Sequence, residues 1–239
     1  MNMLDLTLPS PEENLACDEA LLELCEQDPR QESLRFWEPA QHFVVVGYGT
    51  ECRRSVNLPA CRRRRVPVLR RLSGGGAVLQ GPGCLNYSLV LQIARAPAFA
   101  SVAGTNAAVM ELQRRAIEPL VSAPVRIQGD TDLTLGDLKF SGNSQRRRRH
   151  ALLFHGTLLL ELTLPLMQEL LPVPEPQPAY RRNRPHTDFV TRLPVPAPRL
   201  KQALQHAWGV RESDAEIPSA RIRELAQNRY SSRDWNFRR

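Results

Sequence analysis

Residues 70–79, Arg-Arg-Leu-Ser-Gly-Gly-Gly-Ala-Val-Leu, place three consecutive glycines behind two arginines. Consecutive glycines let the backbone turn sharply and let a ligand approach the main-chain N–H groups closely. A nest of N–H groups suits a phosphate, and arginines add charge-assisted hydrogen bonds to phosphate or carboxylate oxygens. The segment has neither the Gly-Lys-Ser/Thr of a Walker loop nor the spacing of a dinucleotide fingerprint. It predicts an anion-binding turn, although a plain glycine-rich turn with solvated arginines has the same composition.

A second segment, residues 136–145, places a lysine among small residues in the run GDLKFSGNSQ. Only Lys139 and Lys201 are lysines among the 32 basic residues, so arginine is the usual basic residue here. A lysine differs from an arginine by its compact, point-like ammonium group. Such a charge would stabilise an α-phosphate during adenylation and then polarise the mixed anhydride. The alternative is a β-hairpin with an exposed lysine, and Lys201 itself resembles ordinary helix surface.

Two further groups of polar residues lie in apolar surroundings. His155 and Gly156 enter an apolar strand, and Asn14 and Asp18 interrupt an otherwise apolar helix face. All four could face a ligand pocket. The competing interpretation is a hydrogen-bonded structural histidine and the solvent side of a helix.

Hydrophobic periodicity predicts strands and helices that mix without strict βαβ alternation. Strands are expected at residues 33–36, 42–47, 66–69, 85–93, 125–127, 137–140 and 151–162. Helices are expected at residues 11–27, 105–120, 198–208 and 216–227, and loops at 129–132 and 172–198. Residues 51–65 are a polar helix or connection. The sequence predicts an α+β fold, a mixed β-sheet flanked by helices in one domain over residues 1–239, with strands 42–46, 85–93 and 151–162 at its centre.

Composition limits the classes of protein to which the chain can belong. The chain has 239 residues and is 42% hydrophobic, enough for one large domain with a core. No apolar run is long enough to span a membrane, and residues 1–19 lack the pattern of a secretory signal. The five cysteines form no Cys-x-x-Cys pair and no Cys/His cluster, which suits reduced thiols in the cytoplasm.

The formal charge of +7 favours anionic partners, namely nucleotides, nucleic acid or acidic protein faces. The arginine runs at 62–65 and 146–149 leave a nucleic-acid-binding protein as one alternative. These runs lack interleaved aromatic residues and any known nucleic-acid motif. We therefore expect neither a nucleic-acid nor a membrane partner, and an acidic acceptor domain explains the charge equally well.

The order of these segments resembles the lipoate–protein ligase family, within the wider group of biotin and lipoate ligases and octanoyltransferases. The matching segments are NLACDEALL, LRFW with VVVGYGT, RRLSGGGAVLQGPGCLNYSL, GDTDL, GDLKFSGNSQ, HGTLLLEL and RYSSRDWNF. They run in family order from about residue 14 to residue 237. The resemblance implies the catalytic-domain fold of that group and an enzyme that activates lipoate or octanoate with ATP and Mg²⁺. The acyl-AMP is then transferred to a lysine of an acceptor lipoyl domain.

The resemblance also implies residue roles. Lys139 would be the catalytic charge on the adenylate, and Asp132 would lie near the nucleotide or its Mg²⁺. Arg146 would lie on a mobile loop, residues 146–149, that covers the adenylate. The remaining substrate- and adenylate-binding residues would be Arg71, Ser73, Gly74, Gly75, Gly76, Asn14, Asp18, Asn86, Ser141, Gly142, His155 and Gly156, with the last two shaping the acyl pocket.

Three departures from the family pattern matter. Gln80 stands where many family ligases carry histidine, and Cys84 where several carry asparagine, with Asn86 two residues later. The chain stops after the SSRDWNF segment, which precedes a C-terminal accessory domain in single-chain relatives, so we expect a separate accessory subunit. An octanoyl or lipoyl transferase acting through Cys84 is the alternative enzyme, because no cysteine follows it. A biotin ligase lacks support, since the Gly-Arg-Gly-Arg motif is missing.

Overall fold

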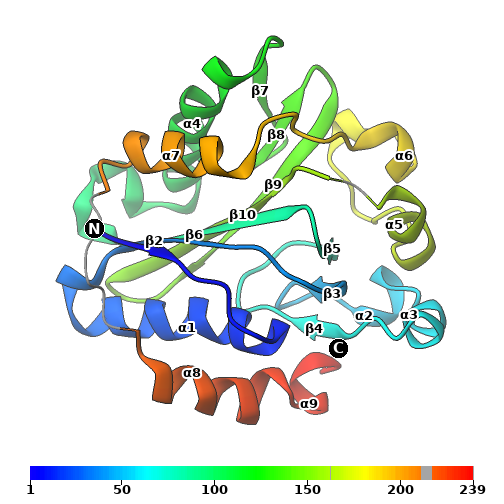
Figure 1. Ribbon diagram of the computed structural model, residues 1–239, viewed down its shortest axis with the longest axis horizontal. Helices are drawn as coiled ribbons and strands as arrows, with labels where there is room; N and C mark the ends of the chain where they lie inside the picture. The colour runs from blue at the N-terminus through cyan, green and yellow to red at the C-terminus, as the bar shows by residue number, and fades with distance from the viewer. Residues whose placement is uncertain (162, 211–216, 239) are drawn as a thin grey trace.

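The computed structural model describes residues 1–161, 163–210 and 217–238, and within them the main sheet has seven strands (Figure 1). In spatial order these are β1 (Asn2–Asp5), β2 (Ser33–Trp37), β6 (Cys84–Gln92), β10 (Ala151–Leu159), β9 (Leu138–Arg147), β8 (Asp132–Leu135) and β7 (Val125–Gln128). β1 is parallel to β2, and the other neighbours are antiparallel. The predicted mixed sheet is confirmed, and the two long apolar strands β6 and β10 lie next to each other near its centre.

The predicted strand 42–47 does not join this sheet. As β3 (Phe43–Val46) it is the middle strand of a second, three-stranded sheet, between β4 (Val68–Arg70) and β5 (Val78–Gln80). Its apolar run faces two clusters: Phe43 and Val45 pack against one, and Val44 and Val46 against the other. A strand with two buried faces has no polar face to indicate its sheet, so the sequence predicted burial correctly but the wrong neighbours.

Helices cover both faces of the main sheet (Figure 1). α1 (Pro11–Gln27), α8 (Ser219–Leu225) and α9 (Arg233–Asn236) lie on one side, and α4 (Val102–Ile117) and α7 (Ala197–Ala207) on the other. The short helices α2 (Cys52–Ser55), α3 (Leu58–Arg64), α5 (Leu164–Leu170) and α6 (His186–Phe189) gather beside the small sheet. The predicted layers, a mixed sheet flanked by helices, are confirmed.

α1 begins and ends where the sequence predicts. Ser10 caps it: the Ser10 hydroxyl accepts from the Glu13 amide at 3.2 Å, and the Glu13 carboxylate accepts from the Ser10 amide at 3.0 Å. Pro11 occupies the first turn, where no amide donor is required. This capping box fixes the end of α1 that later positions Asn14 and Asp18.

Other boundaries differ from the prediction. The strand expected at 137–140 continues to Arg147 as β9, and Asp132, expected in a loop, begins β8. The segment 172–198 contains α6 and the start of α7. The predicted end of a strand at residue 162 and the predicted helix start at residue 216 lie outside the described residues.

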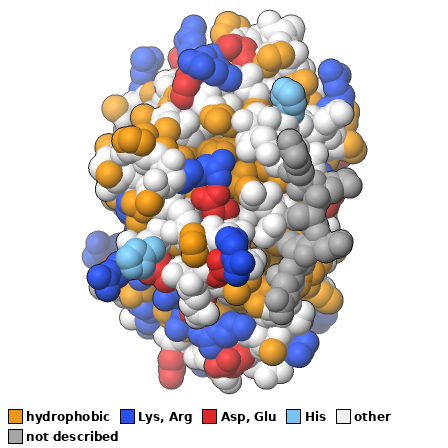
Figure 2. Space-filling view, turned by 90° about the vertical axis from the view of Figure 1, so that its left-hand side faces the viewer, with side chains coloured by type: hydrophobic (Ala, Val, Ile, Leu, Met, Phe, Trp, Pro, Cys, Tyr) orange, Lys and Arg blue, Asp and Glu red, His pale blue; other side chains and the backbone are white. Residues whose placement is uncertain are grey.

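The described helices include none long and apolar enough to cross a membrane. On the face drawn in Figure 2, basic side chains are interspersed with acidic and apolar ones. The described residues also form exposed ion pairs, such as that of Arg115 with Glu111. Such surface pairs add little to stability, so the core clusters hold the fold.

Candidate active site

Lys139 and Asp132 form the charged centre of the candidate site. The Lys139 ammonium lies 2.7 Å from Asp132 Oδ1, and β8 and β9 are neighbouring strands. A register shift between Leu133 and Thr134 lets Asp132 pair with Gly142 while Thr134 pairs with Lys139. The Lys139 side chain therefore folds back over Gly142, where an added Cβ would lie 2.8 Å from Nζ. A larger residue at this position would push the Lys139 ammonium away from its present place.

Tyr180 closes the other side of Asp132. Its hydroxyl donates to Asp132 Oδ2 at 2.7 Å, and burial together with the Asp132 charge raises the pKa of the phenol. Both carboxylate oxygens are thus engaged by groups of the chain itself. Within the described residues no group of three or more His, Cys, Asp or Glu side chains could hold a metal. Asp132 as arranged does not fit the predicted role of Mg²⁺ ligand, because Lys139 and Tyr180 occupy its oxygens.

The predicted glycine turn lies against two other segments. Gly74, Gly75 and Gly76 are exposed, and Gly75 has φ 86°. Thr50 Oγ1 donates to the Gly75 carbonyl at 2.6 Å, and Ser144 Oγ on β9 donates to the Gly74 carbonyl at 3.1 Å. The turn is therefore held between the Gly47–Thr50 segment and the strand that carries Lys139, with its glycines open to solvent.

Arg71 is a buried cation whose contacts in the described residues are all with neutral groups. Its guanidinium donates to Ser73 Oγ at 3.1 Å, to the Gly74 carbonyl at 3.1 Å and to the Val45 carbonyl at 3.4 Å, all neutral acceptors. Burial lowers its pKa to about 10, and in the described residues no carboxylate forms an ion pair with it. A buried charge is costly unless it is paired. Arg71 is therefore suited to meet an anion brought in by a ligand.

Ser73, His155 and Asp18 form a hydrogen-bonded relay behind the turn. Ser73 Oγ lies 2.6 Å from His155 Nε2, and His155 Nδ1 lies 3.1 Å from Asp18 Oδ2. Arg35 Nη1 donates to Asp18 Oδ1 at 2.8 Å, with both side chains buried. Burial alone would raise the pKa of Asp18, but the hydrogen bond from His155 and the Arg35 charge outweigh it and lower that pKa. The ionised Asp18 fixes the orientation of His155, which in turn fixes Ser73.

Two predicted binding residues have their side-chain polar atoms engaged inside the fold. Asn14 Oδ1 accepts from Arg35 Nη2 at 2.6 Å, and its amide donates to two carbonyls of the segment before α1. Asn86 is closed in a buried triangle: it accepts from Thr157 at 2.6 Å and donates to Gln80 at 3.0 Å. In both, the donors and acceptors are used inside the fold, because a buried amide must be satisfied locally.

Asn143 on β9 binds Tyr87 of β6 and Thr131, the residue before β8. Its Oδ1 accepts from the Tyr87 hydroxyl at 2.6 Å, and its Nδ2 donates to the Thr131 carbonyl at 2.6 Å. A Cβ added to Gly156 would lie 1.7 Å from that Oδ1, so Gly156 makes room for the amide. The predicted residue Ser141 is fully buried beside it, as a second acceptor for Nδ2 at 3.3 Å.

The four arginines 146–149 do not form one covering loop. Arg146 and Arg147 belong to β9, Arg147 donates to the Phe99 carbonyl at 2.6 Å, and Arg148 pairs with Glu23 at 2.9 Å. Arg147 and Arg148 therefore bind separate partners within the fold. Arg146 lies over the Tyr48 ring, 5.1 Å from its centroid. Because the Tyr48 amide donates to the Ser73 carbonyl at 2.7 Å, Arg146 is adjacent to the glycine turn.

Cys84 lacks the surroundings of a nucleophile. It is buried, and burial raises its pKa to about 11. A reactive cysteine needs an accessible thiolate at neutral pH, usually beside a positive charge. The arrangement of Cys84 is that of a structural thiol.

The structure therefore brings most of the predicted residues into two linked groups. Lys139, Asp132 and Gly142 form one, and Arg71, the glycine turn and the Ser73–His155–Asp18 relay form the other. Tyr180 and Arg35 were missed by sequence reasoning. Tyr180 lies in a Pro- and Arg-rich segment without a local signal, whereas Arg35 is a charge inside the apolar strand SLRFW, which itself predicts a buried partner.

This geometry suits activation of a carboxylate by a nucleotide. The exposed glycines and, among the described residues, a buried guanidinium without an ion pair offer sites for anionic oxygens. Lys139 is a compact charge on β9, the strand that contacts the turn through Ser144.

Comparison with known proteins agrees with this chemistry. The model of the lipoyl protein ligase A/B catalytic domain family matches residues 10–205. A putative lipoate-protein ligase A of Aeropyrum pernix is 31% identical over 97% of this chain and 90% of its own length. An octanoyltransferase of Brevibacillus brevis is 25% identical over 96% of each chain.

Solved structures share the fold over the whole chain. A bi-partite lipoate protein ligase from Thermoplasma acidophilum, studied with its E2 lipoyl domain, has a TM-score of 0.85 at 24% identity and covers 99% of this chain and 95% of its own. A lipoate-protein ligase A bound with ATP has a TM-score of 0.78 at 24% identity, covering 99% and 98%. With the family match and the relative above 30% identity, this chain belongs to the lipoyl protein ligase A/B catalytic domain family.

Proposed function

We propose that this chain is a lipoate–protein ligase that activates lipoate or octanoate with ATP and transfers the acyl group to a lysine of an acceptor lipoyl domain. The observation that carries the proposal is Arg71, a buried guanidinium beside the open glycine turn that forms no ion pair with a carboxylate of the described residues. An anionic ligand at this turn would supply the missing charge. Family membership and the ATP-bound relative support the choice of a carboxylate and a nucleotide.

In the first step a carboxylate oxygen attacks the α-phosphorus of ATP and pyrophosphate leaves. Arg71 and the amides of residues 74–76 would bind anionic oxygens, and Lys139 would stabilise the charge that develops on the α-phosphate. Lys139 must exchange part of its contact with Asp132 for the phosphate. Mg²⁺, if bound, would supply further positive charge to the phosphates; in this structure Asp132 is engaged by Lys139 and Tyr180 and is not assigned as its ligand.

In the second step the acceptor lysine attacks the carbonyl of the mixed anhydride, AMP leaves, and the amine loses a proton. Lys139 would polarise the anhydride and hold the departing phosphate. The partners proposed are an acceptor lipoyl domain that presents an acidic face, complementary to the charge of +7, and a separate accessory subunit. The bi-partite relative of Thermoplasma acidophilum supports the second partner.

The test is the mass of an apo acceptor lipoyl domain after incubation with the purified chain, lipoate and ATP. Addition of one lipoyl group only when ATP is present is the expected result, and a Lys139→Ala variant should give none. Transfer from an octanoyl carrier protein without ATP, abolished by Cys84→Ser, would instead establish the transferase. The buried Cys84 thiol predicts that Cys84→Ser keeps the ATP-dependent reaction.

A further inference from the structure

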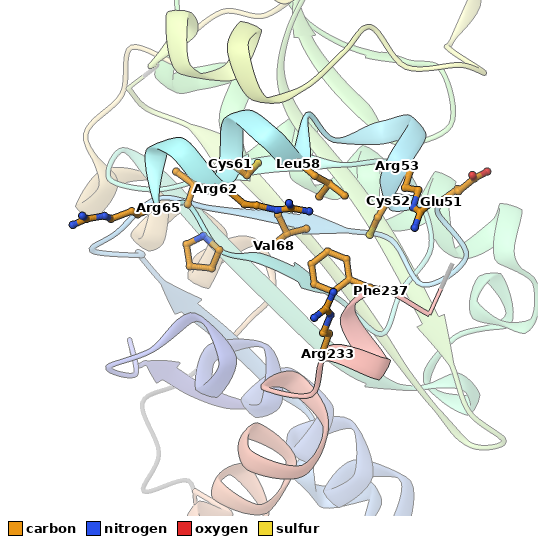
Figure 3. A pocket seen from close by; sticks show the side chains of 12 residues that line it. Glu51, Cys52, Arg53, Leu58, Cys61, Arg62, Arg65, Val68, Arg233 and Phe237 are labelled. Atoms are coloured by element: carbon orange, nitrogen blue, oxygen red, sulfur yellow. The ribbon is translucent and has the colours of Figure 1, made fainter.

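A second concave surface lies away from the candidate site. It is a pocket of about 930 Å³ between α2, α3, β4 and α9 (Figure 3). Its floor is apolar and includes Leu58, Val66 and Val68. Phe237, which directly follows α9, also lines the pocket and is 42% exposed. None of Lys139, Asp132, Arg71 or the glycine turn lines it. The pocket is therefore separate from the chemistry proposed above.

The rim of this pocket is strongly basic. Arg53, Arg62, Arg65 and Arg233 are exposed, and in the described part of the chain none of them forms an ion pair. Glu51, the one acidic lining residue, pairs with Arg54 at 3.1 Å. In Figure 3, Arg62 from α3 and Arg233 from α9 project toward Phe237 from opposite sides. Uncompensated charge around an apolar floor fits a partner that carries acidic and apolar side chains together.

One side of the pocket is the outer edge of a sheet. β4 pairs with β3 alone among the described strands. The Val44 amide donates to the Pro67 carbonyl and the Arg71 amide to the Val46 carbonyl, so Pro67 and Arg71 face β3 and Val68 and Arg70 face outward. The outward Arg70 amide donates to Asn236 Oδ1 at 2.9 Å, whereas Val68 faces the pocket. An extended segment can add to such an edge through its backbone.

The pocket is connected to the glycine turn through Arg70. The buried Arg70 guanidinium donates to the carbonyls of Gly47 at 2.7 Å and Thr50 at 2.8 Å, and to the Asn236 carbonyl at 3.1 Å. Thr50 in turn donates to the Gly75 carbonyl. One side chain thus holds together α9, which borders the pocket, and the segment against which the turn rests.

From these observations we propose that the arginine-rimmed pocket is the docking surface for the accessory subunit, through an extended acidic and apolar segment that adds to the outer edge of β4. The inference rests on the proposed function, which includes that subunit. An acceptor domain must bring its lysine to Lys139 and would dock where the site residues are. A surface without site residues but joined to the glycine turn suits a subunit that assists adenylation.

The probe is a fluorescent hexapeptide of alternating glutamate and valine, with a lysine–valine peptide as its counterpart. Anisotropy should show binding of the glutamate peptide, weakened about tenfold by Arg62→Glu, which corresponds to about 1.4 kcal/mol. Raising NaCl from about 50 to about 300 mM should also weaken it. Arg199→Glu, an exposed arginine on α7, is the matched control and should leave the affinity unchanged. Hydrogen exchange at the Val68 amide should slow when the peptide binds.

The proposal would be overturned by no binding of the glutamate peptide to the wild type, by equal binding to Arg62→Glu, or by equal binding of the lysine peptide. Displacement of the peptide by an apo lipoyl domain would assign the pocket to the acceptor instead and also overturn it. Transfer from synthetic lipoyl-AMP should persist in Arg62→Glu, because Arg62 is outside the site. Failure of that transfer in the wild type would count against the proposed function, independently of the peptide result.

Discussion

Two cations of the site differ in their surroundings, and the difference suits different tasks. Arg71 is buried among neutral acceptors in the described residues, so we expect an anionic ligand to supply its counter-charge. Lys139 already has a counter-ion in Asp132 at 2.7 Å, so its charge can move from carboxylate to phosphate as the reaction proceeds. A flexible ammonium can make this exchange, whereas a planar guanidinium is held by its fork of donors.

Lys139→Arg should therefore fail to support adenylation. The space above Gly142 is filled by the last atoms of the lysine, and a bulkier guanidinium would have to leave it. We expect acyl-AMP formation to fall by about 10²-fold or more, the scale for loss of one preorganised electrostatic group. Lys201→Arg is the control, since Lys201 pairs at the surface with Asp5 and Glu38. Near-normal acyl-AMP formation by Lys139→Arg, measured in a single turnover, would remove Lys139 from the mechanism.

Asp18→Asn should destabilise the fold, because it leaves the buried Arg35 without its counter-ion. Loss of one member of a buried pair costs about 3–5 kcal/mol, to be measured as the free energy of unfolding in urea. Asp5→Asn, which removes an exposed pair with Lys201, should cost at most about 1 kcal/mol. Equal effects of the two variants would contradict a buried role for Asp18.

The stability difference between the wild type and Asp18→Asn should also depend on pH. The pKa of Asp18 is lowered in the folded chain, so its stabilisation is fully present above the unfolded pKa of about 3.9 and is lost as the pH falls through the folded pKa. Asparagine does not titrate at this position. The difference in unfolding free energy between the wild type and Asp18→Asn should therefore shrink in acid below about pH 4. A difference that stays constant with pH would contradict the assignment.

At the scale of elements, the sequence predicted where helices, strands and turns lie, but not which strands and side chains become neighbours. The capped helix α1, the strands β6 and β10, and the glycine turn follow from periodicity and residue type, and all lie where expected. The sheet to which β3 belongs depends on non-local contacts, and the role of Asn86 depends on Gln80 and Thr157 across the sheet. Tyr180 reaches Asp132 from 48 residues away, a distance that no periodicity encodes.

A substitution at Gly156 tests whether the close packing of β10 against Asn143 of β9 is needed for stability and activity. Asn143 Oδ1 fills the place of a Gly156 side chain and is itself held by Tyr87 and, through the amide, by Thr131. Gly156→Ala should therefore displace Asn143, lower the free energy of unfolding by about 1–3 kcal/mol and slow acyl-AMP formation. Gly49→Ala, with nothing within 4 Å of the added Cβ, should change neither. Wild-type stability of Gly156→Ala would show that Asn143 can move freely.

At the scale of the whole molecule, the glycine turn is open while its supports are buried. Gly74, Gly75 and Gly76 are exposed, whereas Arg71 and Ser73 beneath them are buried. A mixed anhydride formed at an open turn is accessible to water, and closure of a site protects such an intermediate. We expect preformed lipoyl-AMP to bind at the turn and Lys139, whereas its synthesis also requires lipoate and ATP to be held together in a closed, preorganised site.

The two half-reactions should therefore differ when the chain acts alone. Transfer of lipoyl groups from synthetic lipoyl-AMP to an apo lipoyl domain should proceed, because Lys139, Arg71 and the glycine turn are in place. Pyrophosphate release from lipoate and ATP should be slower by about tenfold or more, since its transition state depends on a closed, preorganised site. Both rates are measured on the same preparation, so a misfolded sample would lose both. If the two reactions run at comparable rates without a partner, the chain closes its own site, and the arginine-rimmed pocket must serve something other than adenylation.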